Sequence, residues 1–493
     1  MPAALPTPLY RTAQVREIEN AAIHRHGVSA RLLMERAGRA AWDAFRPAWP
    51  NAERVAVVCG AGNNGGDGYV FAQLALEHGC KVQVLALAAQ DALRGEALAA
   101  ADAVLRRGVA PQPVSASGLD GADVIIDAVF GIGLDRDVEG RWRAAIEAMN
   151  ACGRPILAMD VPSGLDADTG RVMGAAVHAS LTVTFLGLKT GLYGGSGPDC
   201  TGRILFSDLD VPNGVYHGVE AAAYRIDLGQ VRDGLRRRQR TAHKGDFGHV
   251  LVIGGDHGFA GAARLAAEAA ARIGSGLVSV ATRPEHAMAI SAARPELMAH
   301  GIASASQLGP LLERASVVAI GPGIGQSDWA QGLFGRVLET RLPLVVDADA
   351  LNLLARDPCR RADWIITPHP GEAARLLDCS TAEVQADRLR AAQALQARFD
   401  GIAVLKGCGT VIADGGGPPA LCSQGNPGMA SGGTGDVLCG AIAGLRAQGL
   451  DAALAARLGV CLHAAAGDAC AVEGERGLLA SDLIAGMRRF ANP

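Results

Sequence analysis

Residues 55–77 read VAVVCGAGNNGGDGYVFAQLALE: an apolar run, a glycine-rich turn and then a helical pattern. Residues 55–59 have the length of a buried strand, and residues 69–77 have the apolar spacing of a helix. Five glycines lie between them with two Asn and one Asp. Glycines before a helix expose N–H groups at the positive end of its dipole, where phosphate binds. The stretch predicts a site for a phosphate-bearing ligand, with an ordinary tight turn as the alternative.

The same alternation of strand and helix continues along the chain. Helical patterns are expected at 12–23, with Thr12 as N-cap, and at 30–45. Short apolar runs of strand length occur at 55–59, 82–87, 124–128, 156–159, 181–185, 249–253, 277–281, 317–320, 344–347, 364–367 and 403–406. The pattern weakens around 202–239. We therefore predict an α/β protein of two three-layer α/β/α domains with mainly parallel sheets, residues 1–222 and 223–493.

Composition excludes several classes of protein. Of 493 residues, 49% are hydrophobic and 19% charged, which is incompatible with a disordered chain. The net charge of -4 argues against nucleic acid as the main partner. Eleven cysteines without a C-x-x-C pair favour a reducing compartment. With no charged leader and no apolar run of about 18 residues, neither secretion nor a membrane location is expected, and we expect a cytoplasmic protein.

Acidic residues end two further strands of the first half. Asp127 closes the run at 124–128, and Asp160 follows the run at 156–159, with Ser163 three residues later. Such residues are often only helix N-caps. Three strand ends that converge on one sheet edge are harder to dismiss. Carboxylate, amide and carbonyl oxygens suit a hard cation, whose identity the spacing leaves open.

The second half carries a glycine-rich turn near its end, residues 426–436, that opens a helix. The segment Gly432-Gly433-Thr434-Gly435-Asp436 places free backbone N–H donors beside a carboxylate. These amides form an anion hole for a moving phosphoryl group, and Asp436 accepts a proton from the attacking hydroxyl. A helix cap is the alternative reading, and no Walker lysine follows the glycines.

Three other strand ends add charged groups to this half. Lys406 stands in a glycine turn suited to a diphosphate, with a plain hairpin as the alternative. His369 lies between two prolines that stiffen its loop, and Glu372 is placed to orient a hydrated Mg²⁺. At Asp347-Ala-Asp349, helix capping by Asp349 is as reasonable as a ligand role.

The three glycine and aspartate motifs of the first half resemble those of the NAD(P)H-hydrate epimerase domain, over about residues 10–220. The resemblance implies a Rossmann-like fold, epimerisation at C6 of the hydrated nicotinamide ring, and Asp160 as the proton-transfer residue. It also implies a potassium ion held by Asn64, Asp127 and Ser163. The implied substrate-binding residues are Asn63, Asn64, Gly65, Gly66, Asp67, Gly131, Ile132, Gly133, Leu134, Asp135, Arg136, Asp137 and Asp160.

Residues 225–490 resemble the ribokinase-like superfamily, and within it the ADP-dependent NAD(P)H-hydrate dehydratases. His369 stands where many sugar kinases of the superfamily have Asn, which favours the dehydratase. The resemblance implies that Ala262, Gly323, His369 and Asp436 contact the hydrate, with Asp436 catalytic. The implied ADP-binding residues are Lys406, Gly407, Cys408, Gly409, Thr410, Asn426, Pro427, Gly428, Met429, Ala430, Ser431, Gly432, Gly433, Thr434 and Gly435.

The two resemblances together imply a fused repair enzyme for NADHX and NADPHX. It would use ADP as co-substrate, Mg²⁺ at the dehydratase site and K⁺ at the epimerase site, and we expect a homo-oligomer. Two other functions stay open. One is a kinase of a small alcohol with a regulatory first half, and the other is a first half that binds a dinucleotide without catalysis.

Overall fold

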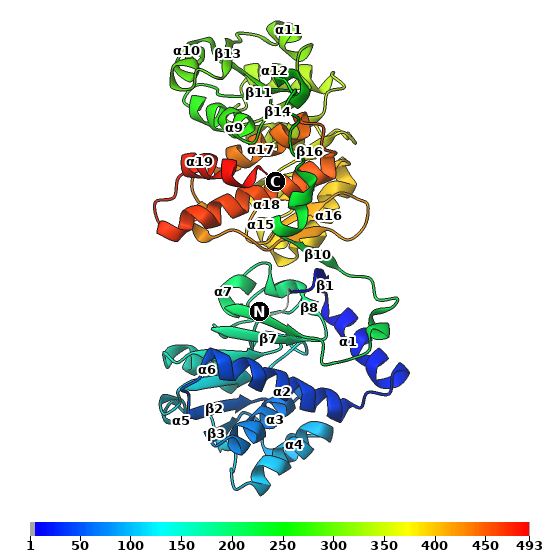
Figure 1. The fold of residues 1–493 in the computed structure, drawn as a ribbon, viewed down its shortest axis with the longest axis vertical. Coiled ribbons are helices and arrows are strands. Elements are labelled where there is room, and N and C mark those ends of the chain that lie inside the picture. The colour runs from blue at the N-terminus through cyan, green and yellow to red at the C-terminus, as the bar shows by residue number, and fades with distance from the viewer. Residues whose placement is uncertain (1–4, 493) are drawn as a thin grey trace. The chain divides into compact units, whose positions relative to one another are not determined.

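The computed structural model describes residues 5–492 and divides the chain into two compact units, Met1–Ala223 and Tyr224–Pro493. In Figure 1 the first unit runs from blue to green and the second from green to red. The boundary falls one residue after the predicted one. Each unit has its own sheet and its own buried core.

The first unit is built on a parallel sheet of order β4-β3-β2-β5-β6-β7-β9. Apart from the added edge strand β9, this is the Rossmann order 3-2-1-4-5-6, whose switch point lies between β2 and β5. A short strand β1 (Pro8–Tyr10) pairs in parallel with β8 (Leu188–Lys189). The strands of the sheet are β4 (Gln112–Pro113), β3 (Lys81–Ala86), β2 (Arg54–Cys59), β5 (Val124–Ala128), β6 (Ile156–Met159), β7 (Leu181–Phe185) and β9 (Arg203–Ser207).

Alternate residues of β2 enter different cores, so helices cover both faces of this sheet. Val55, Val57 and Cys59 belong to one core, with α1 (Thr12–Asn20), α2 (Ala30–Ala48), α3 (Asn63–Glu77) and α4 (Gly95–Arg106). Ala56 and Val58 belong to the other, with α5 (Ala116–Asp120) and α6 (Gly140–Ala151). The short helix α7 (Gly197–Thr201) precedes β9. The predicted three layers are confirmed.

Two helical predictions, at 69–77 and at 12–23, need correction at their N-terminal ends. Helix α3 begins at Asn63, so most of the predicted glycine loop forms its first turns. The cause is close packing: a Cβ on Gly65 would lie 2.2 Å from the Gly60 carbonyl oxygen, and one on Gly68 would lie 2.5 Å from the Ala128 Cβ. In α1, Arg11 occupies the N-cap position and Thr12 is the first helical residue.

The second unit has a sheet of order β13-β12-β11-β14-β15-β16-β17-β18-β19-β10. It is parallel from β13 to β17, whereas β18 runs antiparallel to both neighbours. The sequence pattern predicts β11, β12 and β14 to β17 and misses the rest. The strands are β13 (Met298–Gly301), β12 (Leu277–Thr282), β11 (His249–Ile253), β14 (Val317–Ile320), β15 (Leu344–Val346), β16 (Trp364–Ile366), β17 (Ile402–Leu405), β18 (Thr410–Ala413), β19 (Ala420–Cys422) and β10 (Ala223–Ile226).

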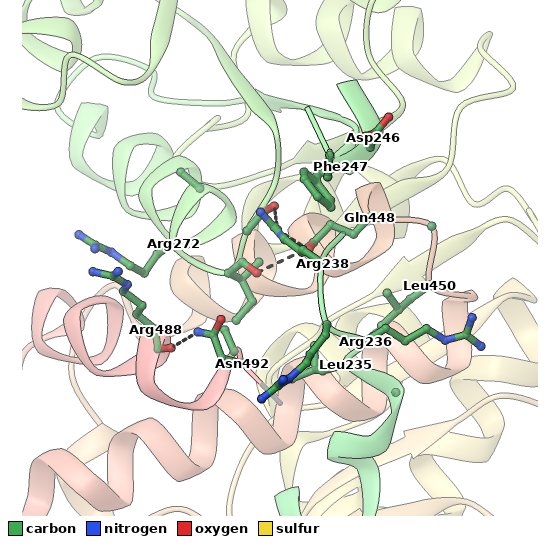
Figure 2. Close-up of a pocket in the computed structure, with 18 of the residues that line it drawn as sticks. Leu235, Arg236, Arg238, Asp246, Phe247, Arg272, Gln448, Leu450, Arg488 and Asn492 are labelled. Carbon is green, nitrogen blue, oxygen red and sulfur yellow. Dashed lines mark hydrogen bonds between the residues drawn. The ribbon is translucent and has the colours of Figure 1, made fainter. Parts of the chain in front are cut away.

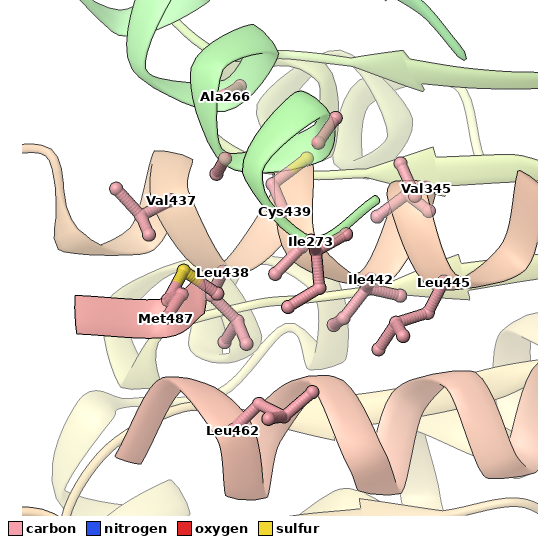
Figure 3. Close-up of a cluster of buried hydrophobic side chains, with 14 of the residues drawn as sticks. Ala266, Ile273, Val345, Val437, Leu438, Cys439, Ile442, Leu445, Leu462 and Met487 are labelled. Atoms are coloured by element: carbon pink, nitrogen blue, oxygen red, sulfur yellow. The ribbon is translucent and has the colours of Figure 1, made fainter. Parts of the chain in front are cut away.

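One face of this sheet is covered by α9 (Ala260–Arg272), α17 (Thr434–Ala447), α18 (Ala452–Cys470) and α19 (Ala480–Phe490). Figure 3 shows their apolar side chains meeting around Cys439 and Ile442 of α17. Helices α9 and α17 approach so closely that a Cβ on Gly440 would lie 1.9 Å from the Ala266 carbonyl oxygen. Because α17 is buried from Val437 to Leu445, its half-buried first turn is held in a fixed place.

Residues Leu251 and Ile253 of β11 lie outside that core and are fully buried, so the opposite face is covered as well. Helix α16 (Arg388–Phe399) packs on β17 and β18. The unit is therefore also three-layered, as predicted. Its other helices are α8 (Leu228–Val231), α10 (Pro284–Ala293), α11 (Gly309–Leu312), α12 (Asp328–Leu338), α13 (Ala348–Arg356), α14 (Pro370–Leu377) and α15 (Thr381–Ala386).

One stretch is more apolar than the sequence analysis expected. Within residues 5–492, the segment Ala452–Glu473 is long and apolar enough by composition to cross a membrane. Of its most apolar window, 67% is buried inside the protein. This is α18, a core helix of the second unit.

Candidate functional site

The first unit contains a cavity of about 700 Å³ at the carboxyl ends of its strands. It lies at the switch point between β2 and β5, where ligands bind in open α/β sheets. The predicted residues Asn63, Asn64, Asp67 and Asp160 line it, as does the whole loop 131–137. The sequence therefore brings most of its predicted substrate-binding residues to one place.

Two predicted residues do not reach this cavity. Gly65 and Gly66 are buried inside α3. A Cβ on Gly66 would lie 2.5 Å from the terminal methyl of Met34, and the corresponding position on Gly65 is filled by Gly60. They let the helix pack closely, and this places Asn64 and Asp67 at the cavity.

Asp160 and Lys189 form the charged centre of the cavity. The fully buried Lys189 Nζ donates to Asp160 Oδ1, to Thr184 Oγ1 at 3.0 Å and to the Phe185 carbonyl at 2.8 Å. Asp160 Oδ1 also accepts from Thr184 Oγ1 at 3.3 Å and from the Phe185 backbone N–H at 3.2 Å. Asp160 has a φ of 67°, a strained conformation that the surroundings must enforce. Lys189 is thus a buried lysine whose charge is paired with Asp160.

The three residues predicted to hold a cation lie beside this centre. Asp127 is fully buried and accepts from the Ser163 hydroxyl at 2.5 Å and from its backbone N–H at 2.8 Å. Burial raises the pKa of Asp127 to about 6, against the lowering effect of these bonds. Among residues 5–492, the buried side-chain oxygen and nitrogen of Asn64 have no hydrogen-bond partner. A Cβ on Gly131 would lie 3.5 Å from Asn64 Cγ and 3.2 Å from Asp160 Oδ2.

In the second unit, Asp436 lies in the first turn of α17, as predicted. Gly433 precedes the helix with a φ of 92°, which favours glycine. Burial, followed by the nearby charge of Asp347, raises the pKa of Asp436 to about 7, although Lys406 opposes the shift. A carboxyl with this pKa changes protonation near neutral pH, as a catalytic base does.

Lys406, at the end of β17, connects Asp436 with two other acids. Its Nζ lies 2.5 Å from Asp347 Oδ1 and 3.9 Å from Glu372 Oε2. A Cβ on Gly435 would lie 3.4 Å from this Nζ and 3.9 Å from Asp347 Oδ2, so the pair sits directly against the first turn of α17. Burial, and then Asp347, raises the pKa of Glu372 to about 7 despite Lys406. One ammonium therefore lies among three carboxyl groups and compensates their charge only in part.

His369 occupies the N-cap position of α14. Its Nδ1 accepts from the backbone N–H groups of Gly371 at 3.0 Å and Glu372 at 3.4 Å, and Glu372 Oε2 accepts from the His369 N–H at 2.7 Å. Burial, with help from Lys406 and Arg375, lowers the pKa of His369. The neutral ring therefore both caps the helix and leaves Nε2 on the side of Glu372, 3.4 Å from its Oε1.

The two loops predicted to hold ADP flank this cluster. Residues 406–409 join the antiparallel strands β17 and β18, so the motif is also a hairpin. In the second loop, the Asn426 side chain donates to Asp468 at 3.0 Å, and the Thr434 hydroxyl donates to the Met429 carbonyl at 3.0 Å. These bonds hold the loop 426–433 at the N-terminal end of α17. Ala262 and Gly323 are neighbours, because a Cβ on Gly323 would lie 3.0 Å from the Ala262 Cβ.

A larger cavity of about 1220 Å³ lies elsewhere in the second unit. Figure 2 shows Arg236, Arg238, Arg272 and Arg488 around it, with Gln448 just beyond the end of α17. Asp436 and Gln448 are twelve residues apart, about 18 Å along the helix. None of the predicted site residues lines this cavity, so size alone does not identify the reactive site.

Sequence reasoning missed one acid that the structure places in a site and left open the role of another, which belongs to the segment Asp347-Ala-Asp349. Glu19 of α1 lines the cavity of the first unit, and Asp347 binds Lys406 in the second. Two signals in the sequence could have indicated them. Glu19 lies four residues after the apolar Val15 and so shares its helix face, and Asp347 directly follows the apolar strand 344–346. Asp349 does not cap α13. Its carboxylate accepts from Gln326 at 3.2 Å and Asn352 at 3.0 Å, whereas Asp347 holds the N-cap position.

Known proteins match the two units in the same order. A family model described as YjeF-related protein N-terminus matches residues 30–191, and one described as NAD(P)H-hydrate dehydratase matches residues 250–489. The bifunctional NAD(P)H-hydrate repair enzyme Nnr of Coxiella burnetii is 49% identical over 488 residues, which cover 99% of this chain and 100% of that protein.

Solved structures match the second unit. A ribokinase-like superfamily protein of Enterococcus faecalis aligns with a TM-score of 0.51 and 30% identity, covering 55% of this chain and 98% of its own. The ADP/ATP-dependent NAD(P)H-hydrate dehydratase of Bacillus subtilis, co-crystallised with ATP and Mg²⁺, has a TM-score of 0.50 and 33% identity over 53% and 95% of the two chains. The predicted ribokinase-like fold of the second unit is confirmed.

Proposed function

Because this chain belongs to the bifunctional NAD(P)H-hydrate repair enzymes, we propose that Asp436 dehydrates S-NAD(P)HX with ADP and that Asp160 epimerises the R and S hydrates. The observation that carries the proposal is the position of Asp436, a carboxyl of pKa about 7 in the first turn of a buried helix. The first unit converts the R epimer into the S epimer, so one dehydration reaction repairs both hydrates.

In the dehydratase, Asp436 takes the proton of the C6 hydroxyl as that oxygen attacks the β-phosphate of ADP. AMP leaves, and the phosphorylated hydrate then loses phosphate to give NADH or NADPH. The N–H groups at the start of α17 and the Lys406 ammonium stabilise negative charge on the moving phosphoryl group. Ala262, Gly323 and His369 contact the hydrate, and loops 406–410 and 426–435 hold ADP.

Mg²⁺ fits the second unit. The buried Glu372 has a pKa of about 7, which marks a carboxyl whose charge the surroundings compensate poorly. Glu372 would hold a hydrated Mg²⁺, which supplies positive charge to the phosphates of ADP. The protein's own residues still carry the proton transfer.

K⁺ fits the first unit. The Asn64 side chain is buried and, within residues 5–492, unpartnered, and Asp127 is fully buried. Amide, carboxylate and hydroxyl oxygens form a donor set for a hard cation. Asn64, Asp127 and Ser163 would hold the ion, which supplies a positive charge beside the substrate phosphates. We propose that the loop 131–137 and residues Asn63, Asn64 and Asp67 contact the hydrate, whereas Gly65 and Gly66 only allow the close packing that places Asn64 and Asp67.

The assay separates the proposal from the two other functions. The full chain is incubated with purified R- or S-NADHX, with and without ADP. NADH absorbance should return from the S epimer only with ADP, together with AMP, and the R epimer should follow through the S form. Phosphorylation of a stable alcohol with ATP, and no recovery of NADH, would support a kinase instead.

Two variants test the first unit alone. Asp160→Ala and Asp127→Ala should abolish or strongly reduce epimerisation of the R hydrate measured without ADP. Unchanged epimerisation in both variants would show that the assigned epimerase site is wrong, whereas a wild-type chain without epimerisation would leave the first unit as a binding module. A cytoplasmic homo-oligomer that accepts both NADHX and NADPHX completes the proposal, and sedimentation of the purified chain measures its oligomeric state.

A further inference from the structure

Of the residues that the structure describes, seven acidic and three basic ones line the cavity of the first unit, and three of the acids, Glu19, Asp67 and Asp160, interact electrostatically with one another. Asp67 and Asp160 come from predicted motifs, whereas Glu19 comes from α1, far away in the sequence. Lys189 is the buried ammonium beside them. Mutual repulsion among buried carboxyl groups favours the protonated form of one of them, so the cavity supplies an acid as well as a base.

Asp160 is the base of this set. Its Oδ1 accepts from the Lys189 ammonium, the Thr184 hydroxyl and the Phe185 N–H, which is the bonding pattern of a carboxylate. Its Oδ2 faces Gly131 at the cavity wall. A carboxylate fixed in this way accepts a proton from a substrate and has none to give.

Glu19 has the opposite surroundings. It is half-buried on the α1 face that carries the buried Val15, and within residues 5–492 no group donates a hydrogen bond to its carboxyl. Burial and the charge of Asp160 raise the pKa of Glu19, against Lys189 and Arg16, which lower it. Burial, Asp160 and Glu19 together raise the pKa of Asp67 well above its usual value. An unpartnered carboxyl beside a fixed carboxylate favours its protonated form.

We propose that Glu19 is a second catalytic residue of the epimerase, which gives a proton to N1 of the hydrated ring while Asp160 takes the proton of the C6 hydroxyl. The proposal rests on the proposed epimerisation. It adds an acid from α1 to the base at the end of β6.

The reaction balances without any further reagent. C6 of the hydrate carries a hydroxyl and is bonded to N1. Asp160 removes the hydroxyl proton, the oxygen electrons form the C6=O bond, and the C6–N1 pair moves to N1, which receives the proton of Glu19. Rotation about C5–C6 presents the other face of the aldehyde. N1 then attacks C6, its proton returns to Glu19, and the oxygen recovers its proton from Asp160.

The test uses the full chain and R-NADHX without ADP. Glu19→Gln should lower kcat of epimerisation by about 10²- to 10³-fold, the usual contribution of a general acid, with KM within about twofold. Glu17→Gln is the matched control, because Glu17 is an exposed acid on the same helix and does not line the cavity. Glu19→Asp should recover part of the lost activity.

The pH profile excludes a merely structural effect. The groups that face Glu19 are Asp67, Asp160, Lys189 and Arg16. In the wild type, activity should fall at high pH as Glu19 loses its proton, and Glu19→Gln should lack this alkaline limb. Wild-type kcat in Glu19→Gln, or a lower kcat with the limb intact, overturns the role of Glu19. A wild-type chain that does not epimerise overturns the proposed function as well.

Discussion

The two units contain the same pair of groups used in two ways. In the first, Lys189 binds the proposed base Asp160 itself. In the second, Lys406 binds Asp347 and leaves Asp436, the proposed base, next to the pair rather than in it. A buried Asp–Lys pair at the carboxyl end of a sheet therefore does not define a role. The role of the lysine depends on whether its ion-pair partner is the proposed base or a neighbouring carboxylate.

This difference fits the two reactions. In the proposed epimerase, Asp160 takes a proton from the substrate hydroxyl and later returns it to the same oxygen. In the proposed dehydratase, Asp436, with its pKa near 7, takes a proton during phosphoryl transfer and then releases it to solvent. The following predictions would break or sharpen this comparison.

The largest effect is expected from Asp436→Asn. The amide keeps the shape of the side chain but cannot accept the proton, so ADP-dependent NADH formation should fall by about 10³- to 10⁴-fold. Epimerisation of R-NADHX by the same variant should stay within twofold of the wild type, because Asp436 belongs to the other unit. Equal loss of both activities would contradict the separation of the two sites.

Removing either lysine should destabilise the unit that contains it. Lys189→Met leaves Asp160 without its ammonium, and Lys406→Met leaves Asp347 and Glu372 without theirs. Loss of one partner of a buried ion pair costs about 3–5 kcal/mol of unfolding free energy. Urea unfolding of the full chain, followed by fluorescence, measures it. A change below 1 kcal/mol in either variant would show that the ammonium does not compensate buried charge there.

The dehydratase should be more active as pH rises through about 7. Asp436 must be ionised to act as the base, so kcat/KM should rise about tenfold per pH unit below 7 and then level off. Asp347→Asn should move the midpoint to lower pH, since Asp347 raises the pKa of Asp436. Glu372 has a pKa of about 7 as well, so the profile is repeated in Glu372→Gln.

The same pKa has a consequence for stability. Between about pH 4 and 7 the folded unit holds a proton on Asp436 that the unfolded chain releases, so the free energy of unfolding should fall as pH rises through this window. In Asp436→Asn this fall should be smaller. An identical pH dependence in the variant would show that Asp436 does not hold the proton.

The smallest effect is expected from Asp349→Asn. Asp349 lies two residues from Asp347, but it bonds only to Gln326 and Asn352 among the residues that the structure describes. Activity should change less than twofold and the unfolding free energy by about 0.5 kcal/mol. A loss similar to that of Asp347→Asn would mean that the strand-end segment acts as a whole.

The sequence predicts the features that depend on residues close together in the chain. The alternation of strands and helices, the glycine turns and the placement of Asp160 and Asp436 follow from periodicity and from the common edge of parallel strands. The edge strand β13 escapes prediction because its residues, MAHG, are exposed or half-buried and form no apolar run. The loss of Gly65 and Gly66 from the cavity wall depends on packing against Gly60 and Met34.

Pairings between distant segments are the part that the sequence conceals. Glu17 and Glu19 are both acids on an amphipathic helix, and only the fold decides that Glu19 lines the cavity. Lys406 and Asp347 are 59 residues apart and meet because β15 and β17 flank β16. Such ion pairs can be predicted only when the order of the strands in the sheet is known, and the spacing of residues along the chain does not give that order.

The scarcity of lysine gives this protein an experimental advantage. Only Lys81, Lys189, Lys244 and Lys406 occur in 493 residues, and two of them lie at the proposed reaction centres. A sample grown with isotopically labelled lysine would show four side-chain resonances in an NMR spectrum. One resonance from each unit would then report directly on ligand arrival, without any engineered probe.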